Sequence, residues 1–316
     1  MSADPTQFEE PILRIRRRIE ELTAAEAGTA TETEIAELRQ KLTKVSNEIY
    51  SNLTPWQKTL VARHPQRPYT LDFISMMIEE WQEIAGDRKF GDDPAVVSGF
   101  GRFRGIPCCV VGHQKGRNTK EKVLRNFGQP RPEGFRKALR VMKLAEKFHL
   151  PVLSFIDTQG AYPGVGAEER GQAEAIAVNL REMAALTVPI IITVIGEGGS
   201  GGALALGVGD RVLMLEHAVY SVISPEGCAA ILWKNSSAAP DAAAAMKITA
   251  QDLKKLNIID EIIPEPVGGA HADPAAAAEL IAPVLERIIR ELQKLKVPAL
   301  LDERYKKFRK MGVFEK

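Results

Sequence analysis

The sequence predicts an α/β fold, because apolar strands alternate with helical segments through the middle of the chain. Residues 151–158 (PVLSFIDT) and 188–195 (VPIIITVI) have the composition of strands, and the second run is apolar throughout, as in strands buried on both faces. Residues 167–186 between them are expected to be helical, and residues 211–224 return to strand. This alternation favours a sheet covered by helices.

Local signals predict the remaining elements of the main domain. Residues 95–114 contain two β-rich runs around a glycine-containing turn, which indicates a hairpin. Residues 132–149 predict a helix, because Pro132 stands near its start and apolar residues recur on one stripe. Further helices are expected at residues 71–84, 224–233, 241–257 and 274–294.

The first part of the chain predicts a helical hairpin. Between residues 8 and 53, apolar residues recur every three or four positions on both sides of a break at 25–34 (AEAGTATETE). Such a hairpin could be a clamp or dimerisation arm, or a cap over the core of the main domain. We therefore divide the chain into a helical segment at 1–55, a main domain at 56–296 and a basic, solvated tail at 297–316.

Composition limits the classes of function. The 316 residues carry 42 Lys and Arg against 41 Asp and Glu, so the net charge of +1 gives no argument for nucleic acid or a membrane surface. Cys108, Cys109 and Cys228 suit a reducing compartment and lack the paired spacing of a zinc ribbon. The sequence shows neither a signal-peptide pattern nor an apolar run of the roughly 20 residues that span a bilayer. We expect a soluble, cytoplasmic protein.

Two glycine-rich junctions follow predicted strands. Residues 155–175 include Gly160, Gly164 and Gly166, and residues 194–207 hold a denser group of glycines. Glycine lets backbone N–H groups approach a ligand without a Cβ in the way, and the helix that follows each junction adds unpaired N–H donors. Such junctions can hold a phosphate or stabilise an oxyanion that develops during a reaction.

The second junction has four alternative interpretations. Residues 196–201 (GEGGSG) match the G-x-G-x-x-G of a dinucleotide site, with Glu216 about 20 residues on, although the following helix has room for only about eight residues. Residues 198–202 (GGSGG) match G-x-S-x-G with Ser200 as a nucleophile, but no histidine completes a recognisable triad. The glycines could also form an oxyanion hole without a nucleophile, or only permit close backbone packing. The pattern alone leaves these alternatives open.

A basic loop precedes the first junction. Residues 112–126 carry Lys115, Arg117, Lys120 and Lys122, which predict either a solvated loop or a site for an anionic group or an acidic partner. The acids nearest the two junctions are not assigned a catalytic role. These acids are Asp157, Glu168, Glu169 and Glu197.

Four long blocks of sequence, taken in order, carry a family resemblance. They are residues 112–134, 156–177, 194–233 and 248–266. With the N-terminal helices, they make the chain resemble the alpha carboxyltransferase subunits of bacterial acetyl-CoA carboxylases over nearly its whole length. The resemblance implies a crotonase-type (ClpP/crotonase-like) fold of repeated β-β-α units, whose family domain could start near residue 39. It favours an oxyanion hole over a dinucleotide site.

The resemblance also implies a reaction and its partners. In that family a biotin carboxylase consumes ATP to carboxylate biotin on a biotin carboxyl carrier protein. The alpha and beta carboxyltransferase subunits, expected as an α2β2 assembly, then transfer the carboxyl group to acetyl-CoA and form malonyl-CoA for fatty acid synthesis. Zinc is expected on the beta subunit and no metal in this chain.

The resemblance assigns site residues by their positions in these motifs. The amides of Gly201, Gly202 and Ala203 are expected to form the oxyanion hole on the biotin side, and Gly198 and Gly199 to shape the approach to it. The remaining expected substrate-binding residues form a facing wall or hold the phosphates of CoA. The wall residues are Tyr162, Pro163, Gly164 and Val165, and the phosphate-binding residues are Lys115 and Arg117.

Overall fold

The computed structural model describes residues 7–24 and 29–312, and within these ranges the strands form one sheet. The strands are β1 (Ile78–Glu83), β2 (Val96–Phe103), β3 (Ile106–His113), β4 (Val152–Thr158), β5 (Ile190–Gly199), β6 (Arg211–Leu215), β7 (Val219–Ser221) and β8 (Glu261–Ile263). Their order is β1-β2-β3-β4-β5-β6-β8, and β7 pairs with the end of β5. β1, β2 and β3 are antiparallel, whereas the strand pairings from β3 to β8 are parallel.

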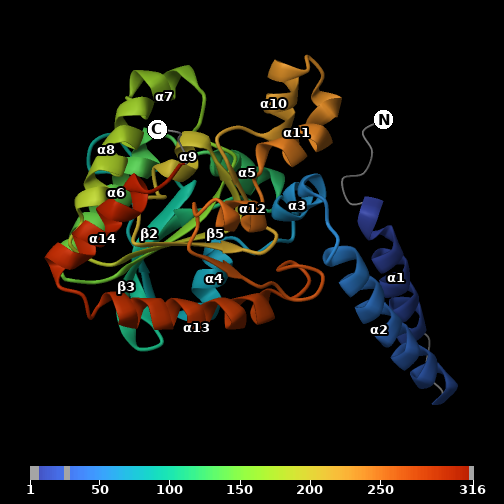
Figure 1. The fold of residues 1–316 in the computed structure, drawn as a ribbon. Coiled ribbons are helices and arrows are strands. Elements are labelled where there is room, and N and C mark those ends of the chain that lie inside the picture. The colour runs from blue at the N-terminus through green and yellow to red at the C-terminus, as the bar shows by residue number, and fades with distance from the viewer. Residues whose placement is uncertain (1–6, 25–28, 313–316) are drawn as a thin grey trace.

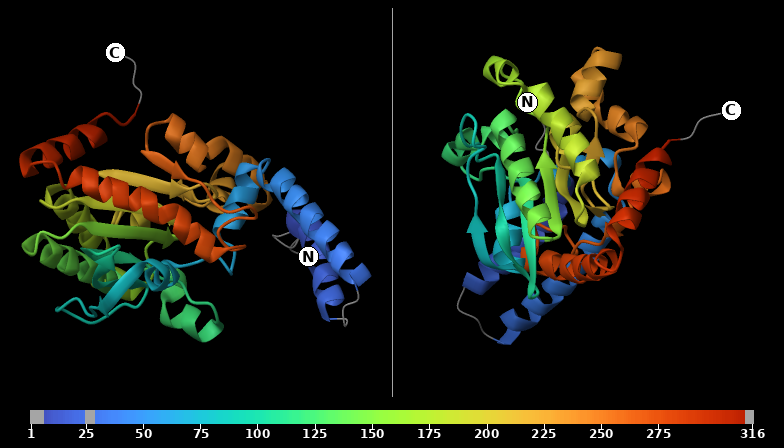
Figure 2. Two further views of the ribbon diagram at one scale, coloured as in Figure 1. Left: turned by 90° about the horizontal axis from the view of Figure 1, so that it is seen from below. Right: turned by 90° about the vertical axis from the view of Figure 1, so that its left-hand side faces the viewer.

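Helices surround this sheet (Figure 1). The shorter ones are η1 (Gln7–Glu9), α3 (Pro55–Ala62), α4 (Thr70–Met77), α5 (Thr119–Leu124), η2 (Asn126–Gly128), α7 (Val165–Glu169), α9 (Ser200–Leu204), α10 (Pro225–Leu232), η3 (Ser236–Ala238), α11 (Ala239–Met246) and α12 (Ala250–Lys255). The longer ones are α1 (Glu10–Ala24), α2 (Thr29–Tyr50), α6 (Pro132–Lys147), α8 (Gln172–Ala185), α13 (Pro274–Leu292) and α14 (Val297–Arg309). Helix α6 packs on β2, β3 and α8, while α13 packs on α4, β5 and β8 (Figure 2). In the described ranges no helix is both long and apolar enough to cross a bilayer.

Most central elements predicted from the sequence are present. The hairpin at 95–114 is β2 and β3, and the predicted strands and the helix that begins at Pro132 are β4, β5 and α6. The helix predicted at 167–186 is divided into α7 and α8, because Gly171 adopts a left-handed conformation with φ of 83°.

The helix predicted at 71–84 is wrong in its second half. α4 ends at Met77, and residues 78–83 form β1, which pairs with β2 as the edge strand of the sheet. The local sequence IEEWQE has no clear strand pattern, so the pairing with β2 decides the conformation.

The solvated tail predicted at 297–316 is also corrected. Residues 297–309 form α14, whose Arg304 side chain is only 1% exposed and forms an ion pair with Asp210 at 2.8 Å. The same guanidinium donates to backbone carbonyls at the end of α8 and in the segment before β5. Residues 313–316 of the predicted tail lie outside the described residues. The buried Arg304 therefore anchors α14 to the main domain, although the basic composition of this segment predicted that its charges lie in solvent.

The N-terminal hairpin is confirmed where the structure describes it. Helices α1 and α2 pack against each other and project from the main domain (Figures 1 and 2). At its base Ile12 and Tyr50 join Leu53 and Val61 in a small separate core. Among the described residues of the hairpin, none belongs to the main core cluster, so these residues do not cap that core. Residues 1–6 and 25–28, which include part of the predicted break, lie outside the described residues. The role as a clamp or dimerisation arm stays a prediction.

Candidate active site

The two glycine-rich junctions lie side by side at one edge of the sheet. β4 and β5 are parallel neighbours, and Thr158 at the end of β4 pairs with Gly198 near the end of β5. Carboxyl ends of parallel strands leave a sheet at the same edge, which is where open α/β sheets bind ligands. The strand predicted at 188–195 is longer than expected: residues 196–199 of the second junction are the last part of β5, which extends to Gly199 through pairing with β4 and β7.

Two glycines of the second junction pack directly on the backbone of the first. A Cβ atom on Gly202 would lie 2.4 Å from the carbonyl carbon of Gly160 and 2.6 Å from the nitrogen of Ala161. A Cβ atom on Gly199 would lie 2.1 Å from the carbonyl oxygen of Gln159. Cβ atoms essentially never approach other atoms within 3.0 Å, so the interpretation of close backbone packing is confirmed at these two positions.

The chain turns sharply from β5 into α9 at Ser200. Its φ of 51° lies in the left-handed region, which is unfavourable for residues other than glycine, asparagine and aspartate. The first N–H groups of a helix have no acceptor within that helix, and in α9 these belong to Ser200, Gly201 and Gly202. We call residues 198–203 the glycine turn. The glycine turn packs closely on the first junction and also carries N–H groups that have no acceptor within the helix. The close-packing and oxyanion-hole interpretations are therefore compatible.

A pocket of about 540 Å³ opens beside the glycine turn. Ser200 and Gly201 line it from the second junction, and Ala161, Tyr162 and Pro163 line it from the first. The pocket therefore joins the two segments that the sequence analysis singled out.

The other predicted residues of the glycine turn are buried. Gly198, Gly199, Gly202 and Ala203 fall among the buried residues and do not line the pocket. Gly198 packs on an aromatic ring, since a Cβ atom there would lie 2.7 Å from Cδ2 of Tyr220. These four residues therefore hold the turn in place, whereas Ser200 and Gly201 border the open space.

The facing wall is only partly assembled from its predicted residues. Gly164 is the N-cap residue directly before α7, and a Cβ atom there would lie 2.2 Å from the ring of Tyr162. The guanidinium of Arg131 lies over the same ring, 4.8 Å from its centre, so Tyr162 packs against both residues. Val165 is 75% exposed, and neither it nor Gly164 lines the pocket.

Lys115 and Arg117 are not free surface charges. The Lys115 ammonium lies 2.5 Å from Oδ1 of Asp157, and its side chain is 13% exposed. Burial lowers the pKa of Lys115, but the carboxylates of Asp157 and Glu197 outweigh it and raise the pKa above its ordinary value. Arg117 pairs with Asp72 at 2.5 Å. The solvated-loop interpretation is therefore wrong for Lys115, and an anion would have to share both cations with carboxylates.

A second buried ion pair supports the strand that leads into the glycine turn. Glu197 is only 5% exposed, and its Oε1 accepts from Nη2 of Arg63 at 2.6 Å. Arg63 also reaches Glu226 at the start of α10, at 2.5 Å. One guanidinium thus joins α3, β5 and α10 around the candidate site.

The contacts of the glycine turn do not match the two rival interpretations, a nucleophilic serine and a dinucleotide site. For a nucleophilic Ser200, the nearby His113 ring is engaged elsewhere, with Nε2 3.2 Å from the carbonyl oxygen of Gly202. For a dinucleotide site, α9 spans only Ser200–Leu204, and the Glu216 carboxylate accepts the backbone N–H of Glu265.

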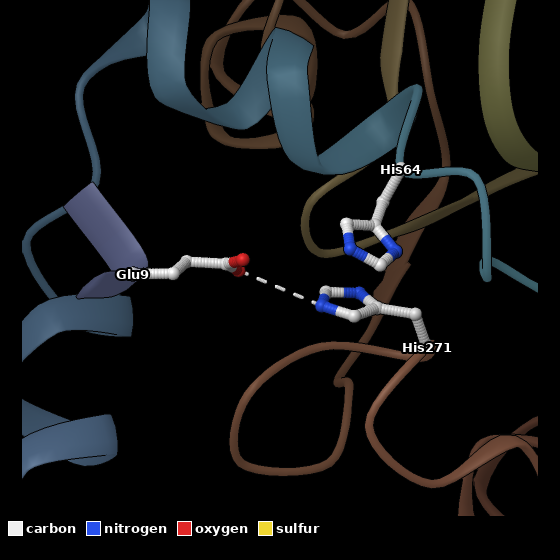
Figure 3. A group of neighbouring side chains, drawn as sticks. All are labelled: Glu9, His64 and His271. Carbon is white, nitrogen blue, oxygen red and sulfur yellow. Dashed lines mark ion pairs between the residues drawn. The ribbon is translucent and has the colours of Figure 1, made fainter. Parts of the chain in front are cut away.

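One group of metal-ligating side chains comes together in the described part of the chain. Glu9, His64 and His271 place ligand atoms within 4.8 Å of one another, with Glu9 pointing at His271 (Figure 3). The His64 and His271 rings stack with centroids 3.8 Å apart, so their in-plane lone pairs run side by side instead of converging on one ion. His64 Nδ1 also accepts the backbone N–H of Gln66 at 3.2 Å, and Glu9 accepts from Tyr50. The group therefore links the N-terminal hairpin to the main domain and does not fit a metal.

Acid is expected to weaken this link. Burial, helped by the neighbouring His271, lowers the pKa of His64 to about 4. An unfolded histidine titrates near 6.5, so between pH 6.5 and about 4 the unfolded chain binds a proton that the folded chain does not, and stability falls as the pH drops. We expect His64→Asn to reduce this dependence in urea denaturation at pH 7 and pH about 4.5. The same slope in both proteins would contradict the prediction.

Known proteins match the whole chain. Residues 5–312 match the family model described as acetyl co-enzyme A carboxylase carboxyltransferase-like. The acetyl-coenzyme A carboxylase carboxyl transferase subunit alpha of Xanthomonas campestris pv. campestris is 56% identical over 317 residues, with 100% of this chain and 99% of that protein covered. The subunit alpha of Geobacter metallireducens is 56% identical over 310 residues, covering 98% and 97%. This chain belongs to the acetyl-CoA carboxylase carboxyltransferase alpha family.

Solved structures support the fold expected for this alpha family. Transcarboxylase 12S matches with a TM-score of 0.54 and 22% identity, covering 70% of this chain and 44% of that chain. A Pseudomonas malonate decarboxylase hetero-tetramer in complex with coenzyme A matches with a TM-score of 0.57 and 16% identity, covering 68% and 86%. The predicted crotonase-like α/β fold is confirmed. As an alpha-family member, the chain is a carboxyltransferase component of the biotin-dependent acetyl-CoA carboxylase of fatty acid biosynthesis.

Sequence reasoning missed two residues that support the alpha-family glycine turn. Arg63 lies in a segment with linker-like composition, and no local pattern connects it to Glu197. His113 lies in the predicted hairpin at 95–114 and is the last residue of β3, and its position at the carboxyl end of a strand next to β4 was the available signal. Recognising it requires the order of the strands, which the sequence alone does not provide.

Proposed function

We propose that this chain supplies the backbone amides of Gly201, Gly202 and Ala203 as an oxyanion hole for carboxyl transfer from carboxybiotin to acetyl-CoA. The observation that carries the proposal is that Gly201 borders the pocket at the first turn of α9, while Gly202 next to it packs on Gly160 and Ala161 with no room for a side chain. Membership of the alpha family supports the reaction.

The proposed reaction passes through two anions. Loss of CO2 from carboxybiotin leaves negative charge on the ureido group, which takes a proton from the methyl carbon of acetyl-CoA. The resulting enolate carbon then bonds to CO2 and yields malonyl-CoA. Removing one N–H donor from such a site typically costs about 2.7–4 kcal/mol of barrier. No protein nucleophile takes part, which is consistent with a turn built mainly of glycine.

The neighbouring residues receive supporting roles in this proposal. Gly198 and Gly199 allow β5 to reach Tyr220 and the first junction without side chains between them. Tyr162 and Pro163 face the turn across the pocket they share with Gly201. Gly164 and Val165, the other predicted wall residues, lie next to them at the start of α7. Val165 is exposed and available to a ligand or partner that extends beyond the pocket.

The prediction that Lys115 and Arg117 bind CoA phosphates remains to be tested. If it holds, Lys115→Ala combined with Arg117→Ala raises KM for acetyl-CoA by about 10-fold or more, because a hydrogen bond to a charged group contributes about 1.5–3 kcal/mol. The matched control is Lys120→Ala with Lys122→Ala on the neighbouring α5, which should leave KM unchanged. An unchanged KM in the first double variant would discard the phosphate role.

We further propose the partners of the alpha family for this chain. These are a beta carboxyltransferase subunit in an α2β2 assembly, with zinc on the beta subunit, a biotin carboxyl carrier protein and an ATP-consuming biotin carboxylase, all in the cytoplasm. Exposed apolar residues at the pocket and on α10 support a protein-covered face. Val222, which lines the pocket, is 76% exposed, and on α10 Ile231 and Leu232 are 59% and 67% exposed.

Reconstitution tests the proposed function directly. The chain is combined with a beta subunit and a carboxylated biotin carrier protein, and malonyl-CoA is measured after addition of acetyl-CoA. Each component omitted in turn provides the control. Malonyl-CoA formation only in the complete mixture supports the proposal, whereas a complete, assembled mixture without product would refute it.

A further inference from the structure

One buried imidazole touches both glycine-rich junctions. His113 is the last residue of β3 and is 0% exposed. Its Nε2 lies 3.2 Å from the carbonyl oxygen of Gly202, and its Nδ1 lies 3.4 Å from the backbone nitrogen of Asp157. The ring therefore connects the end of β4 with the first turn of α9.

These two contacts define which ring nitrogen carries the proton. A backbone N–H can only donate, so Nδ1 of His113 must be the acceptor for Asp157. The single proton of the neutral ring is then on Nε2, which donates to the Gly202 carbonyl. Burial lowers the pKa of His113 to about 4, although Asp157 opposes the shift, so the ring is neutral near pH 7.

The Gly202 carbonyl depends on this donor. In the short α9, the N–H of Ala205 donates to the carbonyl of Gly201, and the N–H of Leu206 donates to the carbonyl of Ala203. The Gly202 carbonyl lies between them and receives the Nε2–H of His113. Because a trans peptide is planar, its C=O and N–H point in opposite directions. Holding the Gly202 oxygen therefore fixes the Gly202–Ala203 peptide, and with it the first turn of α9, whose unpaired N–H groups include those of Gly201 and Gly202.

The other side of the turn is held through Asp157. Its Oδ1 accepts the backbone N–H of Glu197 at 3.0 Å and the ammonium of Lys115 at 2.5 Å. A Cβ atom on Gly196 would lie 2.4 Å from the same oxygen. The strand is thus fixed immediately before Gly198, and a change at His113 acts on the α9 side of an otherwise anchored turn.

We propose that His113 is a positioning residue for carboxyl transfer, which orients the Gly202–Ala203 peptide by donating from Nε2 to the Gly202 carbonyl. This inference rests on the proposed function of the glycine turn, because the first turn of α9 also carries the N–H groups of Gly201 and Gly202, which belong to the proposed oxyanion hole. His113 itself touches no substrate in this role.

Replacing His113 with Gln or with Asn tests its contact with Gly202 separately from its contact with Asp157. The longer amide side chain of His113→Gln carries its nitrogen near the position of Nε2, and can still donate to Gly202. The shorter side chain of His113→Asn places its amide near the position of Nδ1 and loses the contact with Gly202. We expect His113→Asn to lower kcat about 10- to 100-fold with KM for acetyl-CoA nearly unchanged, because a displaced catalytic group can cost about 10²-fold. His113→Gln should restore most of kcat.

The control is His217→Gln, which changes another buried histidine, 3% exposed and paired through its backbone with Glu265, and should leave kcat unchanged. Assembly is checked by gel filtration with the beta subunit, and stability by urea denaturation. Equal kcat in the assembled Asn and Gln variants would overturn the positioning role. Should neither variant assemble, nitrogen-15 NMR of the unmodified protein decides, because a His113 ring protonated on Nδ1 would be incompatible with the proposed donor.

The same assays distinguish this inference from the function on which it rests. An inactive Gly202→Val with a fully active His113→Asn would overturn only the role of His113. Near-normal turnover in assembled Gly202→Val would overturn the oxyanion hole, and the positioning role with it.

Discussion

Gly202→Val is expected to abolish carboxyl transfer while the chain still folds and assembles with its beta partner. The new Cβ would stand 2.4 Å from the carbonyl carbon of Gly160, so the glycine turn must move away from the first junction. Loss of a single oxyanion-hole donor costs about 10²–10³ in kcat, and a displaced turn misplaces more than one donor, so we expect a loss of at least about 10³-fold. Malonyl-CoA formation by the reconstituted complex measures the effect.

Two glycine variants serve as controls for this result. A Cβ atom on Gly91 meets no other atom within 4 Å, so Gly91→Ala should turn over normally. A Cβ atom on Gly201 would lie 3.3 Å from the flexible end of Ile176, so Gly201→Ala keeps the backbone in place and should retain more activity than Gly202→Val. Gel filtration shows whether each variant assembles. Near-normal turnover in an assembled Gly202→Val complex would rule out the proposed oxyanion hole.

Apolar runs and proline positions correctly predicted those elements whose conformation depends on neighbouring residues in the sequence. Residues 190–195 of the apolar run at 188–195 form the first part of β5, and Pro132 marks the start of α6 as expected. The patterns failed where a distant partner decides. Gly198 extends β5 because it pairs with Thr158, and residues 78–83 become β1 because β2 offers an unpaired edge.

The candidate site could be located from the sequence, but its internal contacts could not. Glycines after buried strands pointed to backbone donors, and their placement next to a pocket agrees with that expectation. Charges were harder to interpret, because the sequence around Lys115 suggests a solvated loop and its partner Asp157 lies 42 residues away. His113 carries no catalytic pattern at all, since its role comes from reaching Gly202 across 89 residues.

Arg304→Met is expected to lower the free energy of unfolding by about 3–5 kcal/mol, because it leaves a buried carboxylate without its counter-charge. Nε and Nη2 of Arg304 each lie 2.8 Å from one oxygen of Asp210, whose side chain is 2% exposed. The guanidinium also donates to the carbonyls of Leu186 and Val188, at 2.7 and 2.9 Å. Urea denaturation measures the loss.

The position of Asp210 explains why this anchor matters beyond α14. Its second oxygen accepts the backbone N–H of Ile190 at 2.7 Å, at the start of the strand whose other end is the glycine turn. The matched control is Lys306→Met, which removes an exposed cation on the same helix paired with Asp302, and should cost at most about 1 kcal/mol. Equal stability of the two variants would mean that residues 297–309 are attached as loosely as their basic composition suggests. A selective loss in Arg304→Met would instead show that the buried pair of Arg304 with Asp210 anchors α14 to the main domain.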